Sequence, residues 1–374
     1  MSHRTSPTRP TVTGMRLRTV LATLTAGLAA AATLTAAGPA NARPAADRAT
    51  DTASGTAPTA PTGTATGDAC SPAVSLDGFS DALDKTTFDG TFVGNLSALA
   101  LDGDGSLAAL SDRSSLFRLD AKTLAPESVV PLADESGAAL DSEGLAVDGD
   151  GTRLVTSETE PSVRRYSHDG RILDRLPVPS SLLVAPAGRA TANQTFEGLT
   201  LFPGGRTLLA SMEYAISGDS TGIVRFQTWR RGHGRFALSA QYAYRADPGL
   251  GVPEVQALPD GRLLVLERGF TAGVGNTVRL YLADPRHATD TVGVADLTGQ
   301  DGVRPVRKTL LADIVNCPSR GATAGQPQPN PLLDNIEGMV ITGRAKGRLQ
   351  VLLVSDDNQN AAQTTRFYRL RVRV

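Results

Sequence analysis

Residues 194–214 read QTFEGLTLFPGGRTLLASMEY. Two short runs of alternating apolar residues flank a Pro-Gly-Gly turn, which is the pattern of a β-hairpin. A glutamate stands at each open end, Glu197 before the first run and Glu213 after the second. The two open ends of an antiparallel hairpin lie side by side. The stretch therefore predicts a hairpin that carries two carboxylates at one edge.

The same pattern recurs in four further segments, LSALALDGDGSLAALSDR, SEGLAVDGDGTRLVTSET, PEVQALPDGRLLVLERGF and IEGMVITGRAKGRLQVLLVSDDN. The residues at the start of the five hairpins are Ser97, Glu143, Glu197, Glu254 and Glu337. The residues at their ends are Asp112, Glu158, Glu213, Glu267 and Asp356. Repeated hairpins of this kind are typical of a β-propeller, in which each hairpin supplies the two inner strands of one blade.

We therefore expect an all-β protein with a β-propeller over residues 69–374. Six blades are favoured and five to seven are allowed, because the long interval before Glu337 has room for a further blade around VRPVRKTLLADIV, or for a long loop. A β-sandwich is the main alternative fold, but it does not explain a regular set of hairpins flanked by acids.

The N-terminus has the composition of an export signal. Four arginines precede an apolar stretch rich in Ala and Thr, and the small-residue site Ala40-Asn41-Ala42 follows. We interpret residues 1–42 as a secretory signal peptide, with a membrane anchor as the alternative. Residues 43–68, rich in Ala, Thr, Pro and Gly, are expected to be a disordered linker.

Charge and cysteine content agree with a secreted protein. The formal charge of the chain is −1, and cleavage after Ala42 removes four arginines and no acid, which leaves −5. This acidity gives no basic surface for nucleic acid. We expect a monomer without a stable membrane anchor. Cys70 and Cys317, the two cysteines of the chain, are expected to form a disulfide, with two buried free thiols as the alternative.

The acids of the repeats predict a metal site. The inner strands line the channel of a propeller, so the carboxylates are expected to gather at one mouth, the starting set inside and the ending set farther out. Clustered carboxylates repel one another, and calcium, which takes several oxygen ligands, is the expected counter-charge. The alternative is that the acids cap backbone amides or pair with arginines. Asn358 is a further candidate oxygen ligand.

Several stretches together resemble one known family. They are GNLSALALDGDGSLAALSDR, SEGLAV, TFEGLTLFPGGRTLLASMEY, LLVLERGF, NTVRLYLAD, LDNIEGMVI and LLVSDDN, and they extend over about residues 76–373. In these stretches the chain resembles the secreted phytase-like proteins described as having esterase-like activity of phytase. The resemblance implies a β-propeller, an exported location and hydrolysis of phosphoesters or esters, without fixing a substrate.

Other hydrolytic chemistries have little support in the residues. His233 lies in Gly-His-Gly rather than the Arg-His-Gly of histidine phosphatases, and Ser220 in GDSTG lacks the strand-turn-helix context of a nucleophile elbow. Metal-assisted hydrolysis of a small phosphoester or ester remains, with catalytic residues unassigned. Arg113 and Arg268 could bind the substrate or merely pair with the neighbouring acids. The alternative function is a non-catalytic propeller that binds a ligand or a protein.

Overall fold

A computed structural model describes Met1, residues 67–299 and residues 302–374. The expected signal peptide and all but the last two residues of the expected linker lie outside the described residues. Within the described part of the chain, no helix has the length and apolar character needed to cross a membrane.

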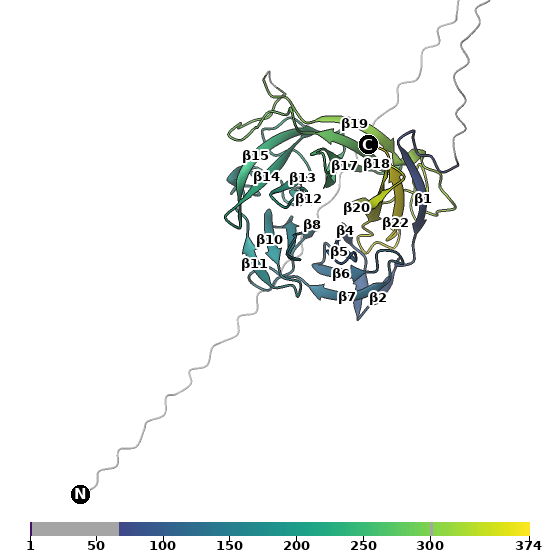
Figure 1. The fold of residues 1–374 in the computed structure, drawn as a ribbon, viewed down its shortest axis with the longest axis horizontal. Coiled ribbons are helices and arrows are strands. Elements are labelled where there is room, and N and C mark those ends of the chain that lie inside the picture. Colours follow the sequence, from purple (N-terminus) through teal and green to yellow (C-terminus); the bar gives the residue numbers. More distant parts are fainter. Residues whose placement is uncertain (2–66, 300–301) are drawn as a thin grey trace, which may run out of the picture. The chain divides into compact units, whose positions relative to one another are not determined.

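The described residues form five four-stranded antiparallel sheets arranged as a ring around a central axis (Figure 1). The first blade comprises β4 (Leu96–Leu101), β5 (Leu107–Ser111), β6 (Ser115–Leu119) and β7 (Pro126–Pro131). The second comprises β8 (Ser142–Val147), β9 (Arg153–Ser157), β10 (Ser162–Tyr166) and β11 (Ile172–Arg175). The third comprises β12 (Phe196–Leu201), β13 (Thr207–Met212), β14 (Ile223–Gly232) and β15 (Arg235–Arg245). The fourth comprises β16 (Gly251–Ala257), β17 (Leu263–Thr271), β18 (Gly275–Asp284) and β19 (Arg307–Asp313).

The fifth blade closes the ring by combining strands from both ends of the domain. Its three inner strands are β20 (Ile336–Ala345), β21 (Arg348–Ser355) and β22 (Phe367–Val372). The outermost strand is β1 (Val74–Ser80), which pairs antiparallel with β22. A small hairpin of β2 (Thr86–Phe88) and β3 (Thr91–Val93) and two short 3-10 helices, η1 (Ser180–Leu182) and η2 (Ile314–Asn316), complete the elements.

The β-propeller prediction is confirmed, and the described blades number five, within the expected range. The segment considered for a further blade, VRPVRKTLLADIV, instead supplies β19, which pairs with β18 as the outer strand of the fourth blade. The rest of the long interval is mainly loop. The sequence could not separate these outcomes, because an outer strand and an inner strand of a new blade have similar apolar patterns.

The inner strands approach one another closely near the axis, and glycine permits this approach. A Cβ atom on Gly198 would lie 2.7 Å from Cα of Glu254 in the next blade. A Cβ atom on Gly144 would lie 2.2 Å from the carbonyl oxygen of Glu197. Contacts this short are not tolerated by a side chain. In these two blades, the Glu-Gly pair combines a carboxylate with a close packing contact between blades.

The predicted disulfide is present, between Cys70 and Cys317. It links the segment just before β1 to the residue after η2, and the two cysteines are 247 residues apart in sequence. Both cysteines belong to the apolar core that also contains Val74 and Leu76 of β1. The bond therefore ties the strand that closes the ring to the end of the fourth blade.

We predict that removing this bond destabilises the ring at its closure. The Cys70→Ser, Cys317→Ser double variant should lose about 2–4 kcal/mol of unfolding free energy, because the bond restricts the unfolded chain over a long loop. Denaturant unfolding of the purified domain measures the loss. Reductant should lower the midpoint of the wild type and leave the double variant unchanged. Equal midpoints for the two proteins in the absence of reductant would contradict the prediction.

Candidate functional site

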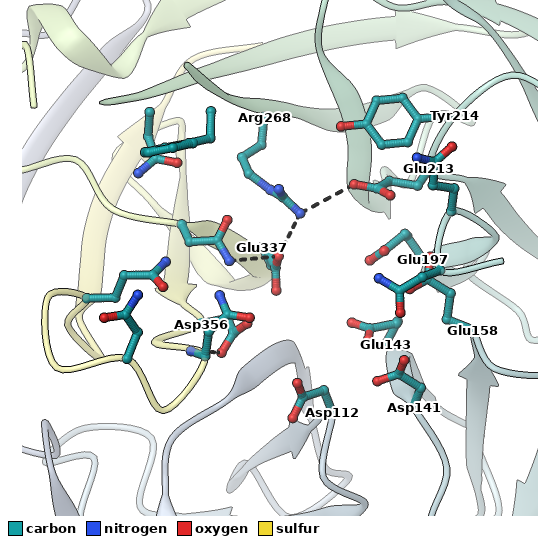
Figure 2. A pocket seen from close by; sticks show the side chains of 18 of the residues that line it. Asp112, Asp141, Glu143, Glu158, Glu197, Glu213, Tyr214, Arg268, Glu337 and Asp356 are labelled. Atoms are coloured by element: carbon teal, nitrogen blue, oxygen red, sulfur yellow. Dashed lines mark hydrogen bonds and ion pairs between the residues drawn. The ribbon is translucent and has the colours of Figure 1, made fainter. Parts of the chain in front are cut away.

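One end of the central channel opens into a cavity of about 610 Å³ whose lining is dominated by carboxylates. Figure 2 shows these side chains converging on the cavity. They come from four of the five blades or their loops and are Asp112, Asp141, Glu143, Glu158, Glu197, Glu213, Glu337 and Asp356. Asn358, the further oxygen ligand suggested by the sequence, also lines it.

The hairpin register explains this convergence in four blades. In the third blade Leu199 pairs with Ala210, which brings Glu197 and Glu213 to the same end of the hairpin. Corresponding pairs occur in the first, second and fifth blades. In the first blade the starting position is Ser97, a buried residue whose hydroxyl interacts with the Glu337 carboxylate.

The fourth blade departs from the predicted alignment by one residue. Val255 pairs with Val265 there, as Leu199 pairs with Ala210 in the third blade. Glu254 therefore stands at the position of Gly198, and Arg268 rather than Glu267 stands at the position of Glu213. Sequence spacing favoured an acid at both positions, whereas the strand pairing gives Pro253 and Arg268. The prediction that Glu254 and Glu267 lie at the channel mouth is wrong.

Glu254 is fully buried in the inner strand β16, away from the cavity lining. The backbone N–H of Val255 donates to its carboxylate at 2.8 Å. Burial raises the pKa of Glu254 well above its usual range, while the backbone amides of Leu199 and Met339 in the two flanking blades act against this rise. The residue therefore serves as a cap for backbone amides, which is the alternative role considered for the acids.

Glu267 is also fully buried, and its neighbours belong to the outer part of the fourth and third blades. Its carboxylate accepts hydrogen bonds from the Tyr244 hydroxyl at 2.6 Å and from the Asp247 backbone N–H at 2.8 Å. Lys308 forms an ion pair with it at 2.5 Å. Because neighbouring side chains of a strand point to opposite faces, Glu267 faces these groups while Arg268 faces the cavity.

Arg268 is the less exposed of the two arginines that line the cavity, with 16% of its side chain exposed. Its Nη2 lies 2.6 Å from Glu337 Oε1 and 3.4 Å from Glu213 Oε1 (Figure 2). These carboxylates raise the pKa of the guanidinium against the effect of burial, so Arg268 stays charged. Arg113 also lines the cavity, but its side chain is 63% exposed and lies 3.5 Å from Asp112 Oδ1. Both arginines thus pair with acids, and their binding of substrate stays a prediction.

Asp141 is a cavity acid that the repeat alignment missed. It precedes β8 and lies two residues before Glu143, a spacing that places both side chains on one face of an extended chain. The sequence SEG drew attention to Glu143 alone, although LDSEG carries both acids. By contrast, Ser220 and His233 are not among the residues that line the cavity, and His233 occupies the turn between β14 and β15.

Two groups of three carboxylates have the arrangement needed for metal coordination. One group is Asp141, Glu143 and Glu158, and the other is Glu158, Glu197 and Glu213. In each group, one oxygen from every residue lies within 4.8 Å of the others. Glu158 belongs to both groups, and the Thr195 backbone N–H donates to its Oε1 at 2.7 Å. The all-oxygen donor set fits a hard divalent cation such as calcium or magnesium.

The electrostatics of the cavity also favour a bound cation. Burial raises the pKa of Glu158 to about 7 and that of Glu213 to about 8, and neighbouring carboxylates add to both shifts. Burial and the charges of neighbouring acids raise the pKa of Glu143 and Glu197 well above their usual range. Burial likewise raises the pKa of Asp112 to about 6, and its Oδ1 has no hydrogen-bond partner among the described residues. Each of these carboxyl groups is easier to ionise when a cation is beside it.

We predict that the cation-free protein loses stability as the pH rises. The folded protein binds more protons than the unfolded chain between the ordinary glutamate pKa of 4.5 and the value of about 8 for Glu213. The free energy of unfolding must then fall across this interval and level off above it. Denaturant titrations of chelator-treated protein from pH 4.5 to 8.5 measure the trend. Glu213→Gln should flatten the slope, and a wild-type stability that rises over the interval would contradict the prediction.

We also predict that Arg268 is needed to tolerate the acid cluster. Arg268→Met should cost roughly 3–5 kcal/mol of stability at pH 8, because it leaves the buried Glu213 and Glu337 without their counter-charge. The loss should shrink at pH 5, where Glu213 is protonated in the fold. Arg286→Met is the control, since solvent screens its exposed pair with Asp284. Equal losses for the two variants would contradict this role.

This chain is similar to known proteins in sequence and, weakly, in structure. An uncharacterized secreted protein from Arthroderma benhamiae is 25% identical over 179 residues, which are 36% of this chain and 35% of that protein. This chain thus matches about a third of its relative's length. A gluconolactonase from Xanthomonas campestris superimposes with a TM-score of 0.40 at 16% identity, covering 76% of this chain and 74% of that one. A putative gluconolactonase superimposes with a TM-score of 0.38 at 15% identity, covering 74% of this chain and 74% of that one.

Those two superpositions are too loose to bear on function. The family model named phytase-like, with the description esterase-like activity of phytase, matches residues 91–359. The match includes every carboxylate of the cavity and both of its arginines. The chain therefore belongs to the phytase-like family.

Proposed function

We propose that the protein is an exported hydrolase of small esters or phosphoesters that depends on a divalent cation, with calcium as the first candidate. The observation that carries the proposal is the convergence of eight carboxylates in one open cavity, where each of two triads has its oxygens close enough to hold a cation. The family description supplies the class of reaction. The relative named as a secreted protein and the disulfide support export.

The residues of the cavity would have different roles in such a site. Asp141, Glu143, Glu158, Glu197 and Glu213 would hold the cation. When bound, a divalent cation polarises the ester or phosphoryl oxygen and lowers the pKa of water. Asp112 lies outside both triads, with its Oδ1 3.5 Å from the exposed Arg113 guanidinium and a pKa of about 6, which suits a general base near neutral pH. Arg268 keeps Glu213 and Glu337 in place through its ion pairs.

The proposal predicts that hydrolysis and stabilisation by the cation depend on Glu158. Glu158→Gln should lower the calcium-dependent hydrolysis of a chromogenic ester or phosphoester at least about tenfold, because both triads lose a shared charged ligand. The same change should reduce the increase in melting temperature that calcium gives to chelator-treated protein. Initial rates with and without calcium, and thermal unfolding of the same samples, provide the two measurements.

Glu127→Gln serves as the matched control, because Glu127 is an exposed glutamate of β7 that pairs with Arg118 outside the cavity. It should leave both measurements unchanged. Calcium stabilisation without hydrolysis of any ester would replace the enzyme with a propeller that binds a ligand or protein. No stabilisation by calcium, magnesium or manganese would mean that the acids have a structural role.

A further inference from the structure

The cavity has two chemically different walls. Six of its eight carboxylates come from the first three blades or the loops beside them. The opposite side is rich in carboxamide side chains from the start of β18, the connection between β19 and β20, and the loop between β21 and β22. These amides, here called the amide wall, are Asn276, Gln326, Asn335, Asn358, Asn360 and Gln363. The side with six carboxylates, here called the acid wall, also carries two amides, Asn193 and Gln194, just before β12.

Several of these amides have hydrogen-bonding capacity to spare. The side chains of Gln326, Asn358 and Gln363 line the cavity. Among the described residues, none of these three side chains has a hydrogen-bond partner. Asn276 is only 2% exposed, and its Nδ2 also lacks a partner there. A buried donor without a partner costs free energy, so a ligand that accepts from it gains affinity. Each amide offers both donors and an acceptor, which suits a hydroxyl group, itself a donor and an acceptor.

The negative charge of the cavity does not favour a strongly anionic ligand. Eight carboxylates face two arginines, and Arg268 is already paired with Glu213 and Glu337. A divalent ion in each triad would bring the positive charges to six, still fewer than the carboxylates. Several phosphates on one substrate would require clustered arginines or lysines. The site therefore lacks the countercharge that a polyphosphorylated compound needs.

The mouth adds an apolar contact beside the amides. Phe270, at the end of β17, lines the cavity and is 55% exposed, and Tyr214 lines it close to Glu213 (Figure 2). An exposed phenylalanine at the edge of a polar cavity offers a flat surface for the C–H face of a ring or chain. Acids, amides and an aromatic ring are thus arranged around one space.

We propose that the substrate is a hydroxyl-rich compound carrying a single ester or phosphoester group, rather than a polyphosphate. The reacting group would lie against the acid wall, where a cation is expected, and the hydroxyl groups would bond the amide wall. This inference rests on the proposed hydrolase function and specifies the substrate of that site. Hydrolysis breaks the bond between the ester oxygen and the acyl carbon or phosphorus. Water supplies the hydroxyl to the acid product and a proton to the alcohol.

A comparison of substrates tests the inference. With calcium in excess over all phosphate groups, rates are measured on a monoacetylated hexitol, a hexitol monophosphate, inositol hexakisphosphate and a simple chromogenic acetate. We expect one of the two hexitol monoesters to have the highest kcat/KM. The Gln326→Ala, Gln363→Ala double variant should raise KM for that monoester about tenfold by removing two hydrogen-bonding groups. Its kcat should change less than its KM, because both amides contact the hydroxyl groups and not the reacting ester.

Gln350→Ala removes an exposed amide of β21 away from the cavity and should have no effect on KM. A higher kcat/KM for inositol hexakisphosphate, or an unchanged KM in the double variant, would overturn the inference. If no ester is hydrolysed with any cation, the proposed function fails. Thermal shifts of the calcium-loaded protein then decide the inference alone, because free hexitol should stabilise the wild type more than the double variant. Stronger stabilisation by inositol hexakisphosphate would overturn it.

Discussion

The close packing of the inner strands around the channel axis is the constraint on which the site depends. Gly144 and Gly198 allow neighbouring blades to approach to distances that any side chain would prevent. The residue before each glycine then has its carboxylate at the channel mouth, beside the acid that ends the same hairpin. The repulsion between acids is thus a direct result of the packing that closes the propeller.

Among the described residues, Arg268 is the half-buried cation that opposes this repulsion within the cavity, and it comes from the blade that breaks the repeat. Arg268 stands where Glu213 stands in the preceding blade, and it contacts Glu213 and Glu337 directly. One arginine cannot neutralise eight carboxylates, so the rest are left to protons or to added cations. Protonation corresponds to the raised pKa values of Glu158 and Glu213. Binding of added cations corresponds to the two oxygen triads.

The loops decide what else can bind at this mouth. The hairpins place acids around it, but the long connection before β20 and the loop after β21 bring Gln326, Asn358 and Gln363 to one side. Loops carry such groups readily because their backbone is not committed to a sheet. The acid wall follows from the repeated architecture, and the amide wall belongs to these particular loops. Under the proposed function, reaction type and substrate choice would depend on different parts of the chain.

The sequence by itself determined the propeller, the disulfide and most of the acid cluster, because alternation, turns and flanking acids are local patterns that repeat. Glu197 and Glu213 could be placed on one edge from their hairpin alone. The number of blades, the burial of Glu254 and Glu267, the presence of Asp141 at the mouth, and the pairing of Arg268 with Glu213 and Glu337 were decided by tertiary structure. A shift of one residue in strand pairing exchanges the two faces of a strand. That register depends on contacts between blades, which no single repeat contains.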